Sequence, residues 1–190
     1  MAWFDGHVRD LGVVDEQLLG PLRRRALELS DFWAGADRLK PNHFACFDGV
    51  VEHIVFRYPQ SQSDHRLSGD FPFYRKWASM IDPIIEASTT AYGFAHGQVS
   101  RIMLAKLLAG GELGVHVDAA PSAEVPHKIH VPLVTESQVV FVAEDQSYHL
   151  AAGRAWEVNN RVPHGGRNPS SIDRIHLIFD YFDADGAHSS

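Results

Sequence analysis

This chain of 190 residues contains a single cysteine, Cys46. One thiol cannot build an internal disulfide framework, which excludes the small disulfide-stapled scaffolds and fits a reducing compartment. Cys46 stands in the aromatic stretch 44–47, where a small buried residue is the simplest expectation.

Long apolar runs are also missing. No run approaches the ~20 apolar residues that a membrane-spanning helix requires. The N-terminal stretch MAWFDGHVRD has neither the basic nor the apolar region of a secretion signal. We therefore expect a cytoplasmic protein without a membrane partner.

Positive charge is scarce and is not clustered. Lysine and arginine number 17 against 24 aspartates and glutamates, which gives a formal net charge of −7. A chain without a Lys/Arg-rich block lacks the electrostatic footprint of a nucleic-acid-binding protein. We expect no nucleic-acid partner.

The length and the 45% of hydrophobic residues suit one well-packed domain and are short for two. We expect a single domain over 1–190. Within it, 1–95 should be mostly helical support with one added strand, and 96–183 should be the core that carries the functional residues. Nothing in the sequence predicts the oligomeric state.

Helical periodicity marks two segments of the first half. Asp15 can cap a helix with apolar positions at helical spacing, although Gly20-Pro21 could delay its start. A second pattern runs over 71–92, where Asp82-Pro83 predicts a cap and a restart. Between the two, VVEHIVFRYP over 50–59 predicts a strand, and QSQSDHRLSGD a polar loop.

The second half reads as short strands separated by Gly, Pro, Asn and Asp. The expected strands are 99–108, 128–135, 138–143, 148–150, 154–158 and 174–182. This pattern predicts a mainly β protein with flanking N-terminal helices, whose core is a jelly-roll or double-stranded β-helix barrel of the cupin-like kind. The loop 119–126 could be a lid or an ordinary connector.

The triplet His116-Val117-Asp118 and the distal His164, in a Pro-His-Gly-Gly turn, are candidate metal ligands. Alternate residues of a strand share a face, so His116 and Asp118 could reach one ion if the sheet brings His164 back. Two imidazoles and one carboxylate leave three coordination positions open, as non-haem Fe(II) oxygenases require. An H-x-D triplet alone also arises by chance in a chain with twelve histidines.

Arg174 begins the alternating run RIHLIFDYF, in which it shares a face with His176 and Asp180. A guanidinium matches a carboxylate bidentately, so Arg174 could clamp the distal carboxylate of an oxidation co-substrate. It could equally be a structural partner of Asp173 or Asp180. Asn168 lies where its amide could hold the turn after His164.

The segment from about 99 to 182 resembles the aspartyl/asparaginyl β-hydroxylase family, which includes bacterial proline hydroxylases and whose members are Fe(II)- and 2-oxoglutarate-dependent dioxygenases. The matching pieces are LLAGGELGVHVD, KIHVPLVT, GRAWEVNNRVPHGGRNPS and DRIHLIFDYF. The resemblance implies that His116, Asp118 and His164 hold the iron and that Arg174 binds the distal carboxylate of 2-oxoglutarate.

The family's basic-x-His-x-Pro-Leu motif also contacts the oxoacid, which the resemblance assigns here to Lys128 and His130. Lysine stands where arginine is usual, so a point charge replaces the guanidinium fork. Some members of the family lack the carboxylate ligand, and the presence of Asp118 makes this chain more similar to the proline-hydroxylase branch.

The resemblance implies an enzyme that uses Fe(II), 2-oxoglutarate and dioxygen to hydroxylate a C–H bond of an amino acid, free or within a peptide. The alternative is a cupin-like metal-dependent isomerase or binding protein without oxygenase activity. Gly110 and Asn168 stand where cupin motifs would have them, but that alternative leaves Asp118 and Arg174 unexplained. A zinc hydrolase with the same three ligands is a third hypothesis.

Overall fold

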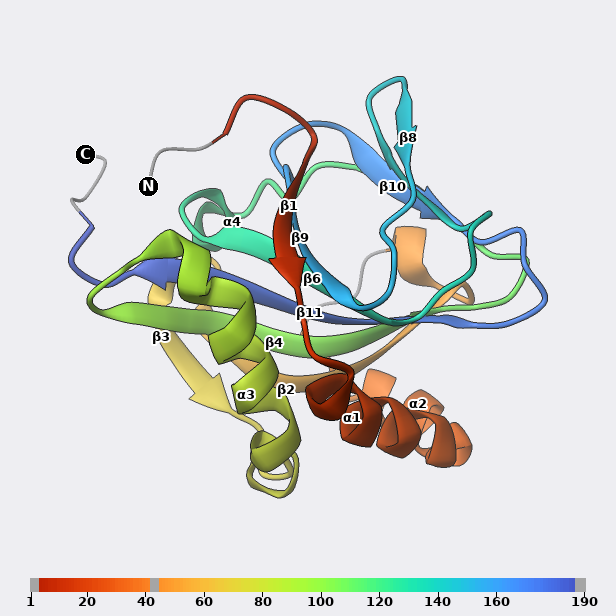
Figure 1. The fold of residues 1–190 in the computed structure, drawn as a ribbon, viewed down its shortest axis with the longest axis horizontal. Coiled ribbons are helices and arrows are strands. Elements are labelled where there is room, and N and C mark those ends of the chain that lie inside the picture. The colour runs from red at the N-terminus through yellow and green to blue at the C-terminus, as the bar shows by residue number, and fades with distance from the viewer. Residues whose placement is uncertain (1–3, 42–44, 187–190) are drawn as a thin grey trace.

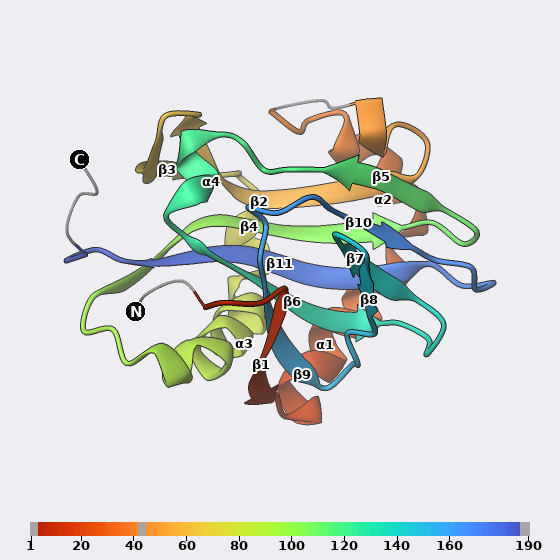
Figure 2. The same ribbon diagram turned by 90° about the horizontal axis from the view of Figure 1, so that it is seen from above.

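Seven antiparallel strands form the larger of two sheets in a computed structural model that describes residues 4–41 and 45–186. In sheet order they are β1 (Val8–Val13), β9 (Arg154–Val158), β6 (His127–Val134), β11 (Arg174–Asp183), β4 (Gly97–Leu107), β2 (Val51–Ser61) and β3 (Asp64–Asp70). Figure 2 shows the central strands of this sheet running side by side.

The smaller sheet has the order β5 (Glu112–His116), β10 (His164–Arg167), β7 (Val140–Ala143) and β8 (Gln146–Tyr148). It lies over one face of the large sheet, and the main helices lie on the opposite side (Figure 1). Two facing antiparallel sheets of this kind form a double-stranded β-helix. The predicted mainly β, jelly-roll fold with N-terminal helices is confirmed.

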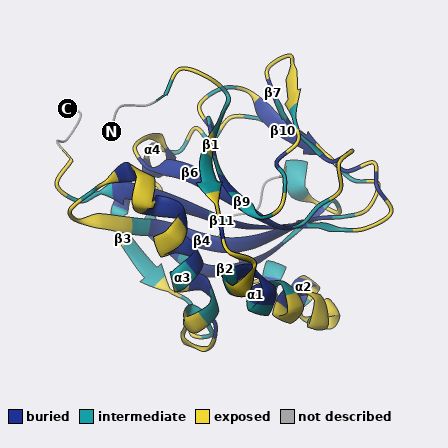
Figure 3. Ribbon diagram, in the orientation of Figure 1, coloured by how far each residue is buried: buried dark blue, intermediate teal, exposed yellow. Residues whose placement is uncertain are grey.

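The helices are α1 (Glu16–Glu28), α2 (Ser30–Asp37), α3 (Ala78–Thr89) and the short α4 (Pro121–Glu124), with single 3₁₀ turns at Ala45–Phe47, Tyr74–Lys76 and Thr90–Tyr92. The Asp15 carboxylate accepts a hydrogen bond from the Gln17 amide at 2.8 Å, so it caps α1 as predicted. Figure 3 shows that the central strands are buried, whereas the outer surfaces of α1, α2 and α3 are exposed.

Two predictions about proline were wrong. Helix α1 already begins at Glu16 and contains Pro21, and α3 runs without a restart through Pro83. Asp82 does not cap a new helix, because its carboxylate accepts a hydrogen bond from the Tyr74 hydroxyl. Each proline removes one backbone hydrogen bond, and burial of the apolar helix face against the sheet offsets that loss.

The first half of the chain holds more β-structure than expected. Strand β1 was not predicted, and β3 occupies most of the segment expected to be a polar loop. Both lie at the edges of the large sheet, where one hydrogen-bonded neighbour suffices and much of the strand stays accessible to water. Such strands need no clear alternation of apolar and polar residues, so the sequence carried little signal for them.

Strand β11 confirms the predicted alternation. Ile175, Leu177 and Phe179 are at most 2% exposed and pack in the main hydrophobic core with the helices. Arg174 and His176 point the other way and line the cavity between the sheets. Strand pairing alone therefore sets the direction in which each functional side chain points.

Within the described residues, no helix is both long and apolar enough to cross a membrane.

Candidate metal centre and co-substrate cavity

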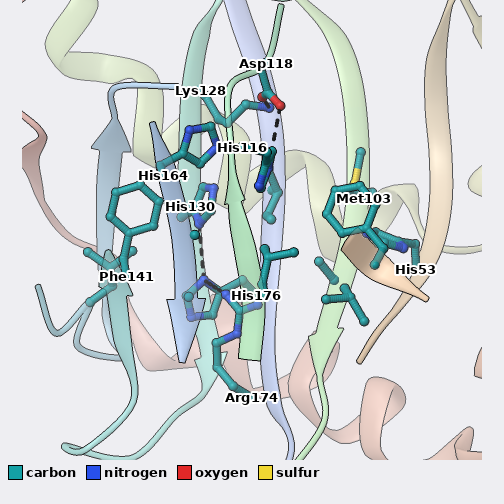
Figure 4. A pocket seen from close by; sticks show the side chains of 18 of the residues that line it. His53, Met103, His116, Asp118, Lys128, His130, Phe141, His164, Arg174 and His176 are labelled. Carbon is teal, nitrogen blue, oxygen red and sulfur yellow. Dashed lines mark hydrogen bonds and ion pairs between the residues drawn. The ribbon is translucent and has the colours of Figure 1, made fainter. Parts of the chain in front are cut away.

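The candidate metal ligands lie at the cavity side of the smaller sheet. They are His116, Asp118 and His164, and all three line the cavity. His116 ends β5 and pairs directly with His164 on β10. Asp118 lies two residues beyond β5, where its amide donates a 3.1 Å hydrogen bond to the Asn160 carbonyl. One potential ligand atom from each side chain lies within 4.8 Å of the others. The fold thus brings together the three residues singled out in the sequence (Figure 4).

Backbone carbonyls set the tautomer of both imidazoles. The Nδ1 atom of His116 lies 2.9 Å from the Gly114 carbonyl oxygen, and that of His164 lies 2.9 Å from the Val162 oxygen. A carbonyl only accepts, so Nδ1 carries the hydrogen, and Nε2 is the nitrogen left to bind a metal. Burial also lowers the pKa of His164, which favours the neutral form that a metal ligand needs.

The carboxylate of Asp118 is held ionised. Burial would raise its pKa, but the charges of Lys128 and Arg101 outweigh burial and lower it well below the ordinary value. The Lys128 ammonium lies 3.2 Å from Asp118 Oδ2. Two neutral nitrogens and one anionic oxygen therefore face a common point, which is the donor set of a non-haem iron site.

Asn160, which sequence reasoning missed, also holds Asp118. Its amide Nδ2 donates to Asp118 Oδ2 at 3.3 Å and to the Ala123 carbonyl at 3.1 Å. The residue singled out in the sequence, Asn168, does not touch the three ligands. Its amide donates to the carbonyls of Leu107, Leu108 and Ile172 and so holds the turn before β11.

At the opposite end of the cavity from Asp118, Arg174 is a partly buried cation without a carboxylate partner among the described residues (Figure 4). Burial lowers its pKa to about 10, and its Nε atom has no hydrogen-bond partner in the described part of the chain. Asp173, one suggested partner, accepts from the Ala109 amide instead, and Asp180, the other, pairs with Lys128 and Arg101. The structural alternative for Arg174 was wrong.

Two buried histidines connect Arg174 with the middle of the cavity. Arg174 Nη1 lies 3.1 Å from His176 Nδ1, which lies 3.3 Å from His130 Nδ1. Arginine cannot accept a hydrogen bond, so His176 Nδ1 is the acceptor and its Nε2 carries the hydrogen. Burial, first, and the charge of Arg174 keep the pKa of both histidines well below the ordinary value. His176 Nε2 has no partner among the described atoms.

Lys128 is placed differently from Arg174. Its ammonium contacts two carboxylates of the protein, Asp118 at 3.2 Å and Asp180 at 3.0 Å. His130 lies on the same strand, β6, and lines the cavity between the three ligands and Arg174. The expected contact of Lys128 and His130 with an oxoacid stays a prediction.

The first half of the chain supplies a wall of this cavity. Lys40, Phe47, His53 and Tyr58 line it together with the barrel residues. The ring of Phe47 packs edge-on against His116 at 5.5 Å between centroids. No motif marked these positions, because their role depends on contacts with residues far along the chain. Cys46 is only half-buried, contrary to the expectation of a buried thiol.

Gly165 is required beside His164. A Cβ atom at this position would lie 2.6 Å from the Leu113 carbonyl oxygen on β5. Only glycine allows β10 and β5 to approach this closely next to the ligand pair.

The residues present fit both an iron ion and an anionic co-substrate. The three convergent ligand atoms suit Fe(II), and the partly buried guanidinium without a carboxylate partner suits an anion. A carboxylate would satisfy the Arg174 fork and is the group that 2-oxoglutarate carries at its distal end.

Solved structures share the fold. A 2OG-Fe(II) oxygenase-family oxidoreductase from Burkholderia pseudomallei aligns at 15% identity over 90% of this chain and 91% of its own, with a TM-score of 0.57. A viral collagen prolyl hydroxylase from Paramecium bursaria Chlorella virus-1 aligns at 11% identity over 92% and 93%, with a TM-score of 0.54. A Pseudomonas putida prolyl-4-hydroxylase aligns at 11% identity over 92% and 90%, with a TM-score of 0.50. No curated protein matches the chain.

A sequence profile of the aspartyl/asparaginyl beta-hydroxylases matches residues 84–184, just over half of the chain. The match contains His116, Asp118, His164 and Arg174 and begins within α3. The chain therefore belongs to the aspartyl/asparaginyl β-hydroxylase family and is a non-haem iron dioxygenase, of the class that uses Fe(II), 2-oxoglutarate and dioxygen.

Proposed function

We propose that this enzyme hydroxylates a C–H bond of an amino acid, free or within a peptide. The observation that carries the proposal is one cavity with three convergent ligand side chains toward one end and the unpaired guanidinium of Arg174 at the other. A metal at the ligands and an anion at Arg174 would share a single cavity, as an oxygenase that couples its co-substrate to substrate oxidation needs.

His116, Asp118 and His164 would hold the iron. When bound there, Fe(II) would supply the oxidising chemistry by which dioxygen and 2-oxoglutarate hydroxylate an unactivated carbon. The chain's own contribution is orientation: two carbonyls fix the imidazole tautomers, and Lys128 and Asn160 hold Asp118 from one side.

Arg174 would bind the distal carboxylate of 2-oxoglutarate, with His176 and His130 along its path. The low pKa values of both histidines keep them neutral, so they offer hydrogen bonds without adding charge. Lys128 would contact the oxoacid near the iron, where its ammonium already lies between two carboxylates. The cupin-like isomerase or binding protein gives no reason for an unpaired Arg174.

We also propose that 1–190 acts as one catalytic domain. Strands of the first half flank those of the second in the large sheet: β1 pairs with β9 at one edge, and β2 and β3 extend from β4 at the other. The single cysteine supports a cytoplasmic location.

Anaerobic titration with Fe(II) tests the ligand assignment. His116→Ala and His164→Ala should each remove most of the iron affinity, because each deletes one of three donors. The matched control is His96→Ala, since the side chain of His96 is 68% exposed and pairs with Asp185 instead of a ligand. Iron affinity at the wild-type level in both ligand variants would contradict the assignment.

A screen of amino acids and peptides for substrate-dependent succinate formation tests the activity. The expected product is an amino acid that has gained one oxygen atom, detected by mass spectrometry. Turnover without 2-oxoglutarate would contradict the proposal.

A further inference from the structure

A second cavity adjoins the metal centre. It lies between the end of β2 and the segment from Val117 to Ala123, and it shares Phe47, Tyr58, Arg101, His116 and Asp118 with the central cavity. The residues at the co-substrate end of the central cavity do not line this second cavity; they are Arg174, His176 and His130. The second cavity therefore reaches two of the three ligands at the end remote from Arg174, where a second small molecule has room.

Arg101 is the buried cation of this shared wall. It projects from β4, is 9% exposed and stacks on the Tyr58 ring at 4.9 Å from the centroid. Its single ion pair joins Nη1 to Asp180 Oδ2 at 3.2 Å, and its Nε atom has no hydrogen-bond partner in the described part of the chain. A guanidinium carries five N–H donors, so most of the donor capacity of Arg101 is unused.

The charges around the two cavities leave a positive excess. Lys40, Arg101, Lys128 and Arg174 line the central cavity with a single carboxylate, Asp118. Asp180 adds one more negative charge between Arg101 and Lys128. Asp37, which bonds to His53 beside Lys40, adds another, so that four cations face three carboxylates. Fe(II) and the doubly charged 2-oxoglutarate would cancel each other and leave this excess as it is.

Burying unbalanced charge is costly, so the site would be completed by a further anion. Arg174 sits with the co-substrate and Lys128 already contacts two carboxylates. Arg101, which stacks on Tyr58, is the cation in the second cavity, and its guanidinium has donors left for a carboxylate.

We propose that Arg101 binds a carboxylate of the substrate in the second cavity and so selects amino-acid substrates that carry a carboxylate close to the hydroxylated carbon. This inference rests on the proposed function. The carboxylate could be the α-carboxylate of a free amino acid or the side chain of an acidic residue. Both present the same fork-matching group, and the test separates them.

The test measures binding without turnover. Protein loaded anaerobically with Fe(II) and 2-oxoglutarate is titrated by calorimetry with the free amino acids, with their α-amides, and with aspartate and glutamate blocked at both ends. Free acids that bind while their amides do not identify an α-carboxylate. Binding of the blocked acidic residues identifies a side-chain carboxylate.

Arg101→Gln should weaken binding of the carboxylate probe roughly 10- to 150-fold, the range for loss of a charge-assisted hydrogen bond. Affinity for 2-oxoglutarate, whose anchor Arg174 lies at the opposite end of the central cavity, should stay within about threefold of the wild type. Arg101→Lys keeps the charge and fills most of the volume, so it should fold and recover part of the affinity. The matched control is Arg167→Gln on β10, whose exposed side chain lies outside both cavities.

Unchanged affinity of Arg101→Gln for the best carboxylate probe would overturn the inference. So would a wild type that binds only the amides, or that binds none of the carboxylate probes. An equal loss of 2-oxoglutarate affinity in Arg101→Gln would show a merely structural role. Failure of the wild type to bind Fe(II) and 2-oxoglutarate would instead overturn the proposed function, which keeps the two failures distinct.

Discussion

The two faces of the large sheet use the same strands for opposite purposes. On β11, Leu177 and Phe179 are fully buried against an apolar core that includes the helices. On the other face of the same strand, His176 is buried and Arg174 is partly buried, and each keeps a nitrogen without a hydrogen-bond partner among the described residues. Burial of apolar side chains on one face stabilises the fold. Burial of polar and charged groups on the other face offsets part of that stabilisation.

This comparison teaches where substitutions should affect stability and where they should affect binding. Residues of the helix-covered face should change the free energy of unfolding and leave ligand affinity alone. Substitutions on the cavity face should lower ligand affinity. Where they remove an unpaired charge, they should leave the free energy of unfolding equal or raise it. The four predictions below test that separation.

The largest effect is expected for Phe179→Ala on the helix-covered face. The substitution should lower the free energy of unfolding by about 3–5 kcal/mol, because it removes a fully buried ring and leaves a cavity. Urea denaturation of the iron-free protein measures it, with Ile178→Val on the cavity side as the milder control. Iron affinity of the folded fraction should not change. A loss below about 1 kcal/mol would mean that Phe179 contributes little to the packing of the core.

Arg174→Met should separate binding from stability. Affinity for 2-oxoglutarate should fall by at least roughly 1.5–3 kcal/mol, since a charge-assisted pair is lost. Without 2-oxoglutarate, the free energy of unfolding should stay equal or rise, because an unpaired, partly buried charge is replaced by an apolar chain of similar volume. Calorimetric titration and urea denaturation measure the two effects.

Arg174→Lys is the matched control, since it keeps the charge but loses the fork. It should lose affinity for 2-oxoglutarate without gaining stability. Unchanged 2-oxoglutarate affinity in both Arg174 variants would remove the assigned role and favour the cupin-like alternative.

Asn160→Ala and Asn168→Ala compare an asparagine that holds a ligand with one that holds only the backbone. Asn160→Ala should weaken Fe(II) binding roughly 10- to 100-fold, because Asp118 loses a hydrogen bond that orients it. Asn168→Ala should leave iron affinity unchanged but destabilise the fold by about 1–3 kcal/mol, since buried carbonyls lose their donor. Anaerobic iron titration and urea denaturation measure the two effects. Equal changes in iron affinity for the two variants would contradict the role assigned to Asn160.

The smallest effect concerns pH. His130 and His176 have folded-state pKa values well below 6.5, their approximate value in the unfolded chain, because burial disfavours the charged form. Below 6.5 the unfolded state therefore binds more protons. Stability should be complete above that pH and fall as pH decreases, by up to about 1.4 kcal/mol per unit for each histidine.

Urea denaturation of the iron-free protein between pH 7.5 and 5 measures this slope. His176→Gln should reduce it by one proton, whereas the exposed His96→Ala should not reduce it in this way. An equal slope in His176→Gln and the wild type would mean that the folded protein also protonates His176.

The proposed iron ligands and Arg174 were open to prediction because their signals are local. His116 and Asp118 lie two residues apart, and Arg174 begins a run of ten strand residues with regular alternation. The longer strands of the second half were found for the same reason. Strand β10, expected as a turn around His164, was missed, and so were the edge strands β1 and β3, which have little alternation. Asn160 was missed because its contact with Asp118 joins residues 42 positions apart.

By itself, the sequence determined the class of fold, the ligand types and the direction in which Arg174 points, since these follow from side-chain chemistry and the two-residue period of a strand. Only the tertiary structure decided which groups stay unpaired. In the folded chain Asp180 pairs with Lys128 and Arg101, and Arg174 has no carboxylate partner among the described residues. Tyr58 of the first half packs against Arg101. Pairing of buried charges depends on distances between strands, and strand order in a rolled sheet is set by packing of the whole chain.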